Sequence, residues 1–317
     1  MEEKYAISPE LLRYRQALPL YVKEGMTRDR IRNFVDRYGT DGVYLSLSGG
    51  KDSYVLFNIV RSMYPSIEAV YVDTWMEFPQ IRSFIKQFDN VRTLKPKKGL
   101  KQIIEECGWC FPGKEVANTV EAARRGVPWA VRKMNGTDKN GMPDKYRKRF
   151  NNWSFLMDAP FLISDQCCLE MKENPLIQYE NESGKKPIVA LLAEESERRK
   201  TAYLKTGCNS FASRRVMSKP MAFWTEQDIL WYIVRHNIGI APPYGNIIKG
   251  RDGKLQCTGE QRTGCMFCPV GCHLNGFAKY RRLREYNRQL YDYCMYELGL
   301  DFVLKWIKEN VRCRRFH

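Results

Sequence analysis

The chain has 317 residues, of which 44% are hydrophobic and 13% aromatic, and its formal net charge is +16. This length supports one large core or two modest ones, and the lack of a run of about 18 apolar residues argues against a membrane span. The acidic, polar start MEEKYAISPE does not resemble a secretion signal, so the 11 cysteines favour a reducing, cytoplasmic location.

The first third of the chain is expected to alternate strands and helices. Residues 9–37 have the pattern of helices that precede the core, within an N-terminal segment of residues 1–40. The expected strands and helices that follow are Val43–Leu47, Ser53–Met63, Ile67–Val72, Pro79–Phe88, Val91–Leu94 and Leu100–Cys107. This alternation predicts an α/β fold with a doubly wound, mostly parallel sheet.

The later part of the chain departs from this rhythm. Residues 111–150 are turn-rich and basic, which predicts an insertion in a nucleotide-binding domain of residues 41–245. Pro187–Ala193 is expected to be a buried strand, and Thr225 is expected to cap a helix over Glu226–His236. Residues 246–317 are predicted to form a Cys-rich metal segment followed by basic helices.

Positive charge is concentrated in two segments. Residues 95–150 hold 14 Lys or Arg against 6 Asp or Glu, and residues 279–317 hold 10 against 5. Solvated helix faces are one interpretation. The other is a track for phosphates, carried by a nucleic acid such as tRNA or DNA or by a highly charged nucleotide.

The segment VYLSLSGGKDSYVLF predicts an anion-binding loop. It combines a short apolar strand, a turn with Gly49 and Gly50, and a helix, and this geometry directs backbone N–H groups at an anion. It is not a Walker A loop, because Leu45 stands where that loop needs glycine and Lys51 is followed by Asp52. The three spaced glycines of the dinucleotide fingerprint are also absent.

The hexapeptide Ser48-Gly49-Gly50-Lys51-Asp52-Ser53 resembles the PP-loop of the ATP pyrophosphatase and adenylyl-sulfate reductase superfamily. Further segments resemble motifs of these reductases in the same order. They are VDTWMEFPQIRSFI (Asp-Thr-Gly-x-x-Phe-Pro-Glu-Thr), CCLEMKENPL (Cys-Cys-x-x-Arg-Lys-x-x-Pro-Leu), EESERR (Glu-Ser-x-x-Arg), KPMAFWTEQDILWYI (Pro-Leu-x-x-Trp-x-x-x-Asp-Val-x-x-Tyr-Ile) and RTGCMFC (Gly-Cys-x-x-Cys). Over residues 43–272 the chain is therefore identified as a member of the phosphoadenylyl-sulfate (PAPS) reductase family, with its adenine nucleotide alpha-hydrolase-like fold.

The resemblance implies a nucleotide site and a metal centre. The loop N–H groups and the hydroxyls of Ser48 and Ser53 would hold the phosphates of ATP or an adenylyl sulfate, with Mg²⁺ as a further candidate. Lys51 would counter their charge and Asp52 would orient the loop. The other nucleotide-site residues that the resemblance implies are Asp73, Thr74, Ser196 and Arg199. The implied ligands of a [4Fe–4S] cluster are Cys167, Cys168, Cys265 and Cys268.

Several cysteines keep more than one interpretation. Thiolate quartets suit zinc as well as iron–sulfur clusters. Cys107 and Cys110 are a second Cys-x-x-Cys pair, which fits a structural zinc site, a redox pair or two buried thiols. The alternative ligands to the implied four are Cys208, Cys257 and Cys272.

Two departures from the family pattern leave the reaction open. Leu192 stands where sulfonucleotide reductases carry an arginine, and Cys313 lies in a basic tail, VRCRRFH, that differs from their Glu-Cys-Gly-Leu-His ending. In one mechanism, a thiolate such as Cys313 attacks the sulfur of an adenylyl sulfate and a thiol partner releases sulfite. In the other, ATP adenylates a nucleic acid and sulfur from a donor displaces AMP. A third hypothesis is a nucleotide sensor without turnover.

Overall fold

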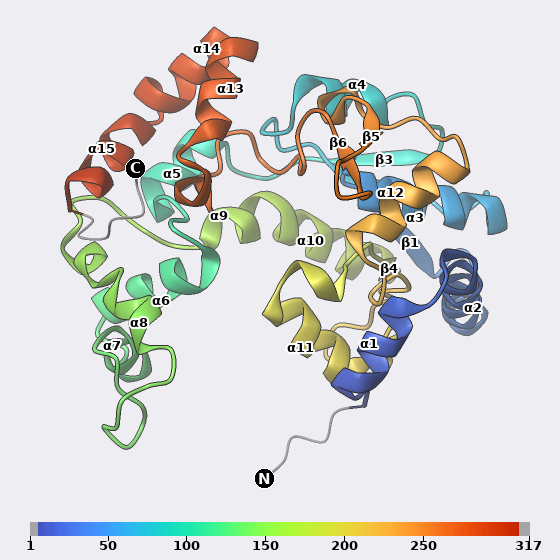
Figure 1. The fold of residues 1–317 in the computed structure, drawn as a ribbon, viewed down its shortest axis with the longest axis horizontal. Helices are drawn as coiled ribbons and strands as arrows, with labels where there is room; N and C mark the ends of the chain where they lie inside the picture. Colours follow the sequence, from blue (N-terminus) through green and yellow to red (C-terminus); the bar gives the residue numbers. More distant parts are fainter. Residues whose placement is uncertain (1–5, 311–317) are drawn as a thin grey trace. The chain divides into compact units, whose positions relative to one another are not determined.

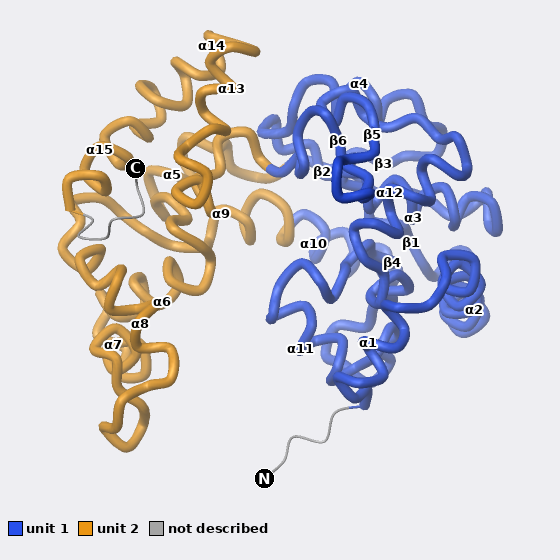
Figure 2. Tube along the Cα trace, viewed as in Figure 1, with its two compact units in different colours: residues 1–95, 175–264 blue, residues 96–174, 265–317 orange. Residues whose placement is uncertain are grey.

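The computed structural model describes residues 6–310, which form two compact units (Figure 2). Unit 1 contains residues 6–95 and 175–264, and unit 2 contains residues 96–174 and 265–310. The N-terminal helices thus belong to the unit with the phosphate loop. The basic residues 111–150 and the segment that begins at Cys265 share the other unit.

Unit 1 is built on a parallel four-stranded sheet with the order β3-β2-β1-β4. The strands are β1 (Val43–Ser46), β2 (Ala69–Val72), β3 (Val91–Leu94) and β4 (Lys186–Ile188). The chain leaves β1 toward β2 on one side, whereas β4 pairs with β1 on the other. The loop after β1 therefore lies where the strand order reverses, the position at which open α/β sheets bind ligands. The predicted α/β fold with a parallel sheet is confirmed.

The described residues of unit 1 also form helices (Figure 1). They are α1 (Pro9–Ala17), α2 (Leu20–Tyr38), α3 (Lys51–Met63), α4 (Pro79–Ile85), α10 (Asn174–Ser183), α11 (Glu197–Thr206) and α12 (Glu226–Arg235). Of these helices, α10 and α11 were not predicted from the sequence. In α3 the predicted stripe of Val55, Leu56, Ile59 and Val60 is buried in the core. A short antiparallel hairpin, β5 (Ile247–Lys249) and β6 (Leu255–Cys257), completes the unit.

The start of α12 is fixed by a buried ion pair. Thr225 and Asp228 form the predicted capping box, and Asp228 also accepts a 2.7 Å contact from Lys23 on α2. The Lys23 side chain is only 2% exposed, so the pair is shielded from water. These contacts hold the first turn of α12 in place, including its exposed neighbour Glu226.

The strand predicted over Pro187–Ala193 is too long, because β4 ends at Ile188. Beyond it, the N–H of Val189 donates to the carbonyl of Ser218 and that of Ala193 to Ala222. These residues bond a neighbouring loop instead of a strand of the sheet. The chain then forms a 3₁₀ turn over Ala193–Glu195.

Unit 2 is helical among its described residues. Its helices are α5 (Leu100–Cys107), α6 (Lys114–Arg124), α7 (Pro128–Met134), α8 (Arg147–Asn151), α9 (Gln166–Cys168), α13 (Ala278–Tyr286), α14 (Arg288–Asp292) and α15 (Leu300–Asn310). Three of them lie in the segment 111–150, whose turn-rich sequence does not indicate them. Across residues 6–310, no helix combines the length and apolarity needed to span a bilayer.

Candidate functional site

The predicted phosphate loop connects β1 to α3 in unit 1. Gly49 adopts a positive φ of 74°, and a Cβ at this position would lie 2.4 Å from Cγ2 of Ile81 on α4. Close packing against α4 therefore requires glycine here. Gly50 precedes α3 and brings no capping side chain, so the N-cap residue itself does not cover the N–H groups of the first helical turn.

The two loop serines bond each other. Their Oγ atoms are 2.9 Å apart, and the Ser53 hydroxyl also lies 2.9 Å from the carbonyl oxygen of Gly50. The backbone N–H of Ser48 donates to Ser53 Oγ at 3.2 Å. These bonds hold the turn between β1 and α3 in place.

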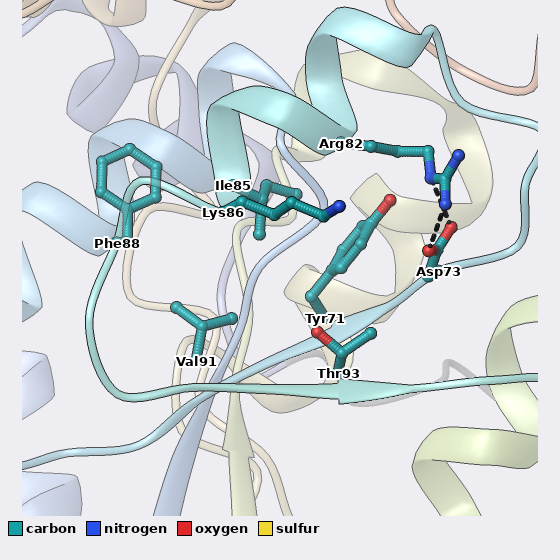
Figure 3. A pocket seen from close by; sticks show the side chains of 8 residues that line it. All are labelled: Tyr71, Asp73, Arg82, Ile85, Lys86, Phe88, Val91 and Thr93. Carbon is teal, nitrogen blue, oxygen red and sulfur yellow. Dashed lines mark hydrogen bonds and ion pairs between the residues drawn. The ribbon is translucent and has the colours of Figure 1, made fainter.

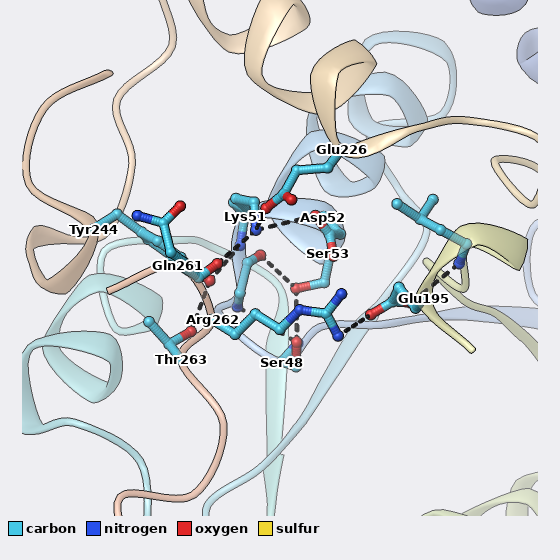
Figure 4. A network of polar contacts seen from close by, with 12 residues as sticks. Ser48, Lys51, Asp52, Ser53, Glu195, Glu226, Tyr244, Gln261, Arg262 and Thr263 are labelled. Carbon is cyan, nitrogen blue, oxygen red and sulfur yellow. Dashed lines mark hydrogen bonds and ion pairs between the residues drawn. The ribbon is translucent and has the colours of Figure 1, made fainter. Parts of the chain in front are cut away.

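Lys51 is almost fully buried and engaged inside the protein (Figure 4). Its Nζ lies 3.0 Å from Oε1 of Glu226 and donates to the carbonyl oxygen of Gln261 at 2.8 Å. Burial alone would lower the pKa of Lys51, but the carboxylates of Asp52 and Glu226 outweigh it and raise the pKa. The lysine therefore stays charged.

A second hydroxyl network holds the loop from the side. The Tyr244 hydroxyl accepts the backbone N–H of Lys51 at 2.9 Å and lies 2.7 Å from Oγ1 of Thr263. Because the sequence motif covers only residues 48–53, Tyr244, Thr263, Gln261 and Glu226 were not predicted as site residues. The segment APPYGN, which ends the α12 region, carries the tyrosine but no feature that connects it to the loop.

Two arginines and one glutamate lie beside the loop. Glu195 contacts Arg199 through Oε2. Its Oε1 lies 3.4 Å from the guanidinium of Arg262 (Figure 4). Burial raises the pKa of Asp52, whereas the positive charges of Lys51, Arg262 and Arg199 lower it, so these cations are close to Asp52. A small cavity of ≈ 10 Å³ is lined by Lys51, Asp52, Leu192, Glu194, Glu195, Glu226 and Arg262.

Ser196 has a local structural role in this structure. It precedes α11 and its hydroxyl accepts the backbone N–H of Arg199 at 3.3 Å. This cap positions the first turn of α11, from which Arg199 reaches Glu195. The Glu-Ser-x-x-Arg resemblance implies Ser196 and Arg199 as nucleotide-site residues. In the structure Ser196 caps α11, and Arg199 supplies a positive charge beside the loop.

Asp73 and Thr74 follow β2, the strand next to β1. Asp73 forms an ion pair with Arg82, with 2.9 Å between Oδ1 and Nε. The Arg82 guanidinium also stacks on the Trp75 ring, 3.5 Å from the ring centroid. Trp75 has a positive φ of 61° and stands at the position of the glycine in the Asp-Thr-Gly motif, so a bulky residue here adopts a backbone conformation that favours glycine. The Thr74 hydroxyl donates to Glu77.

A larger cavity of ≈ 190 Å³ lies between α4 and the strands β2 and β3 (Figure 3). Asp73, Arg82, Lys86 and Thr93 supply its polar lining, and Phe88 is among the apolar residues. The Asp73 carboxylate also accepts the backbone N–H of Trp75 at 3.2 Å.

The predicted cluster ligands all lie in unit 2, where Cys110 is a neighbour of Cys167. Hydrogen bonding to the neighbouring thiol of Cys110 raises the pKa of Cys167 to about 12, and Cys167 raises that of Cys168. Burial raises the pKa of Cys268, and the neighbouring thiols of Cys265 and Cys168 raise it further. Lys279 donates to the carbonyl oxygens of Cys265 and Cys268, at 2.6 and 3.3 Å.

The donor chemistry and the side-chain arrangement point in different directions. Soft thiols suit an iron–sulfur cluster or zinc. Yet among residues 6–310 no three His, Cys, Asp or Glu side chains are grouped so that they could hold a metal ion. The predicted catalytic Cys313 lies outside the described residues. Cys208 and Cys257, which were considered as alternative ligands, belong to unit 1 and not to the unit of these thiols.

Comparisons with known proteins agree with the resemblance in the region of the loop. Residues 42–112 match the model of the phosphoadenosine phosphosulfate reductase domain. No curated protein matches the sequence of the chain. A solved structure with a TM-score of 0.40 and 13% identity covers 74% of this chain and 90% of its own, and it is the PAPS reductase of Candida auris in complex with phosphate. The segment that carries the phosphate loop, residues 42–112, is thus similar in sequence to the phosphoadenosine phosphosulfate reductase domain.

Proposed function

We propose that the protein is an adenosine-nucleotide-dependent, sulfur-handling enzyme that binds the phosphosulfate or polyphosphate end of its nucleotide at residues 48–53. One observation supports this most directly. Within the segment that matches the family domain, the first turn of α3, which has no side-chain cap from Gly50, and the side chain of Lys51 follow the carboxyl end of β1. Backbone amides and a buried cation together are the groups that bind a phosphate.

In the first candidate reaction, the loop binds an adenylyl sulfate or PAPS. A thiolate, for which Cys313 is the proposed source, forms a bond to the sulfur as the sulfur–oxygen bond to the phosphate breaks. The nucleotide leaves with the electron pair of that bond, and Lys51 and Arg199 would stabilise the added charge on its phosphate. An external thiol then attacks the cysteine sulfur, which releases sulfite and forms a disulfide.

We also propose that unit 2 holds an iron–sulfur cluster through Cys167, Cys168, Cys265 and Cys268. The close approach of Cys110 to Cys167 supports a site rich in thiols at this place. When bound, such a cluster would supply electron transfer or a site for sulfide. Lys279 would hold the turn between Cys265 and Cys268 through their carbonyl groups.

The second candidate reaction is ATP-dependent thiolation of tRNA or DNA. It is supported by the basic character of residues 95–150 and 279–317, nearly all of whose described positions lie in unit 2. The loop would bind the triphosphate of ATP and release pyrophosphate, and a sulfur donor would displace AMP from the nucleic acid. This reaction makes a different product from the same phosphate site.

The test compares the two products. Anaerobically purified protein is incubated with PAPS or adenylyl sulfate and a thiol reductant, and sulfite is measured; in parallel, pyrophosphate release from ATP is measured with tRNA or DNA. We expect one of the two products, and we expect Lys51→Met to lower its rate by at least about 100-fold. Lys254→Met, at an exposed position of the same unit, is the control and should leave the rate unchanged.

Two results would contradict an enzymatic role. ATP or PAPS that binds at Lys51 without either product would indicate a nucleotide sensor. If neither nucleotide binds, the loop is not a phosphate site and the proposed function fails as a whole.

A further inference from the structure

Leu192 stands at a position where a cation would be expected to bind the nucleotide. Sulfonucleotide reductases carry an arginine at this position, and here the side chain is an apolar group that is 2% exposed. A guanidinium is the side chain best suited to bind a phosphate or sulfate in two places. Without one, the nucleotide site has lost a cation at this wall.

Arg262 lines the same cavity as Leu192. Lys51 and Asp52 of the phosphate loop line it as well, so the wall that lacks the family arginine receives a guanidinium from another segment of unit 1. Arg262 lies in the EQRTG segment just before the Cys-x-x-Cys motif, 70 positions along the chain from Leu192. Its neighbours Gln261 and Thr263 bind Lys51 and Tyr244, which fixes this segment against the loop.

The charged neighbours of Arg262 include the carboxylate of Glu195 and the guanidinium of Arg199. Arg262 and Arg199 both contact the carboxylate of Glu195, one oxygen each. Burial lowers the pKa of Arg199, and the positive charge of Arg262 lowers it further, so the two guanidinium groups repel each other. A pair of cations that converges on one carboxylate is also a pair that can bind one phosphate or sulfate group.

We propose that Arg262 replaces the family arginine at position 192 and binds the terminal anionic group of the nucleotide together with Arg199. The side chain of Arg262 is 63% exposed, so its guanidinium is free to turn from Glu195 to a ligand. This inference rests on the proposed function, because it assigns a residue to the same nucleotide site.

The test measures affinity for ATP, adenylyl sulfate and adenosine by calorimetry. Arg262→Ala should weaken binding of ATP and adenylyl sulfate by about 10- to 100-fold and leave binding of adenosine unchanged, because adenosine has no anionic group. Arg262→Lys should lie between the wild type and Arg262→Ala. Arg251→Ala, at an exposed position of the same unit, controls for the loss of one positive charge and should change affinity less than about twofold.

A second variant moves the guanidinium from position 262 to position 192. The double variant Leu192→Arg/Arg262→Ala should regain at least about tenfold of the lost ATP affinity, since position 192 lines the same cavity and then supplies the guanidinium. Thermal unfolding of each variant shows whether it is folded. If the double variant does not fold, the Ala and Lys variants and the adenosine measurement decide.

The possible failures are distinct. If the wild type binds neither ATP nor adenylyl sulfate, the proposed function is wrong. If the wild type binds and Lys51→Met weakens binding while Arg262→Ala behaves like Arg251→Ala, only the role of Arg262 is overturned. An equal loss of adenosine affinity in Arg262→Ala would also overturn it, because the residue would then act on the structure of the site.

Discussion

The phosphate loop of unit 1 and the thiols of unit 2 differ in how the chain assembles them. The loop residues are consecutive, and a strand, a glycine turn and a helix set their positions. The thiols come from three segments, around Cys110, Cys167 and Cys265, and only the fold of unit 2 brings them near one another. Contiguous sites are therefore readable from a motif, whereas the arrangement of a dispersed site depends on packing that no short motif contains.

The largest expected effect tests the dispersed site. Cys265→Ser/Cys268→Ser should reduce bound iron from roughly four atoms per chain to near zero, because a cluster loses two of its ligands. ATP affinity should be retained, since the residues that we place in the nucleotide site all belong to unit 1. Iron and sulfide analysis after anaerobic purification measures the first result and calorimetry the second.

The controls show which thiols matter. Cys208→Ser, at a buried cysteine of unit 1, should keep its iron. A loss of iron in Cys110→Ser would add that residue to the ligands. Full iron in the Cys265→Ser/Cys268→Ser variant, or zinc in a colourless wild type, would show that unit 2 does not hold the proposed cluster.

A smaller effect tests how unit 1 positions Glu226. Lys23→Met removes the partner of Asp228 and leaves its carboxylate, which is 12% exposed, without its ion pair. The free energy of unfolding should fall by about 3 kcal/mol, the usual cost of breaking a shielded pair. Denaturant titration measures it. Arg13→Met breaks the 70% exposed pair with Glu10 and should cost less than about 1 kcal/mol; equal losses would contradict the role of burial.

The smallest effect concerns Glu68, just before β2. Burial alone would raise its pKa, but hydrogen bonds from Tyr179, Arg92 and Lys185 outweigh it and lower the pKa to about 2. Because the folded state lowers this pKa, the carboxylate stabilises the fold above the pKa of the unfolded chain, about 4.3, and the gain is lost as the pH falls toward 2.

Glu68→Gln should therefore lower the free energy of unfolding by about 1–2 kcal/mol at pH 6 and by almost nothing near pH 2. Urea titrations at several pH values measure the difference. Glu197→Gln, at a glutamate that is 88% exposed, is the control and should show no such dependence. A difference that is constant with pH would mean that charge is not its cause.

Much of unit 1 could be predicted from the sequence, because its strands and helices follow one another with distinct apolar patterns and are separated by turn or capping residues. The stripe on α3 and the capping box of Thr225 are local features of this unit, and the structure confirms them, as it does the helix α5 in unit 2. The helices at 114–151 were missed, since Gly and Asn in that segment favour turns and tertiary packing overrides them. Arg262 and Tyr244 were missed for another reason, because they reach the loop from about 200 positions away.

The internal engagement of Lys51 has a consequence for selectivity. In the resting protein each cation at the loop already faces a carboxylate, with Glu226 against Lys51 and Glu195 against the two arginines. Chloride or another ion with one negative charge gains little by displacing such a neighbour. A ligand with several negative charges can exchange with both carboxylates at once. Self-neutralisation would thus keep abundant small ions out of the site and reserve it for polyvalent ones.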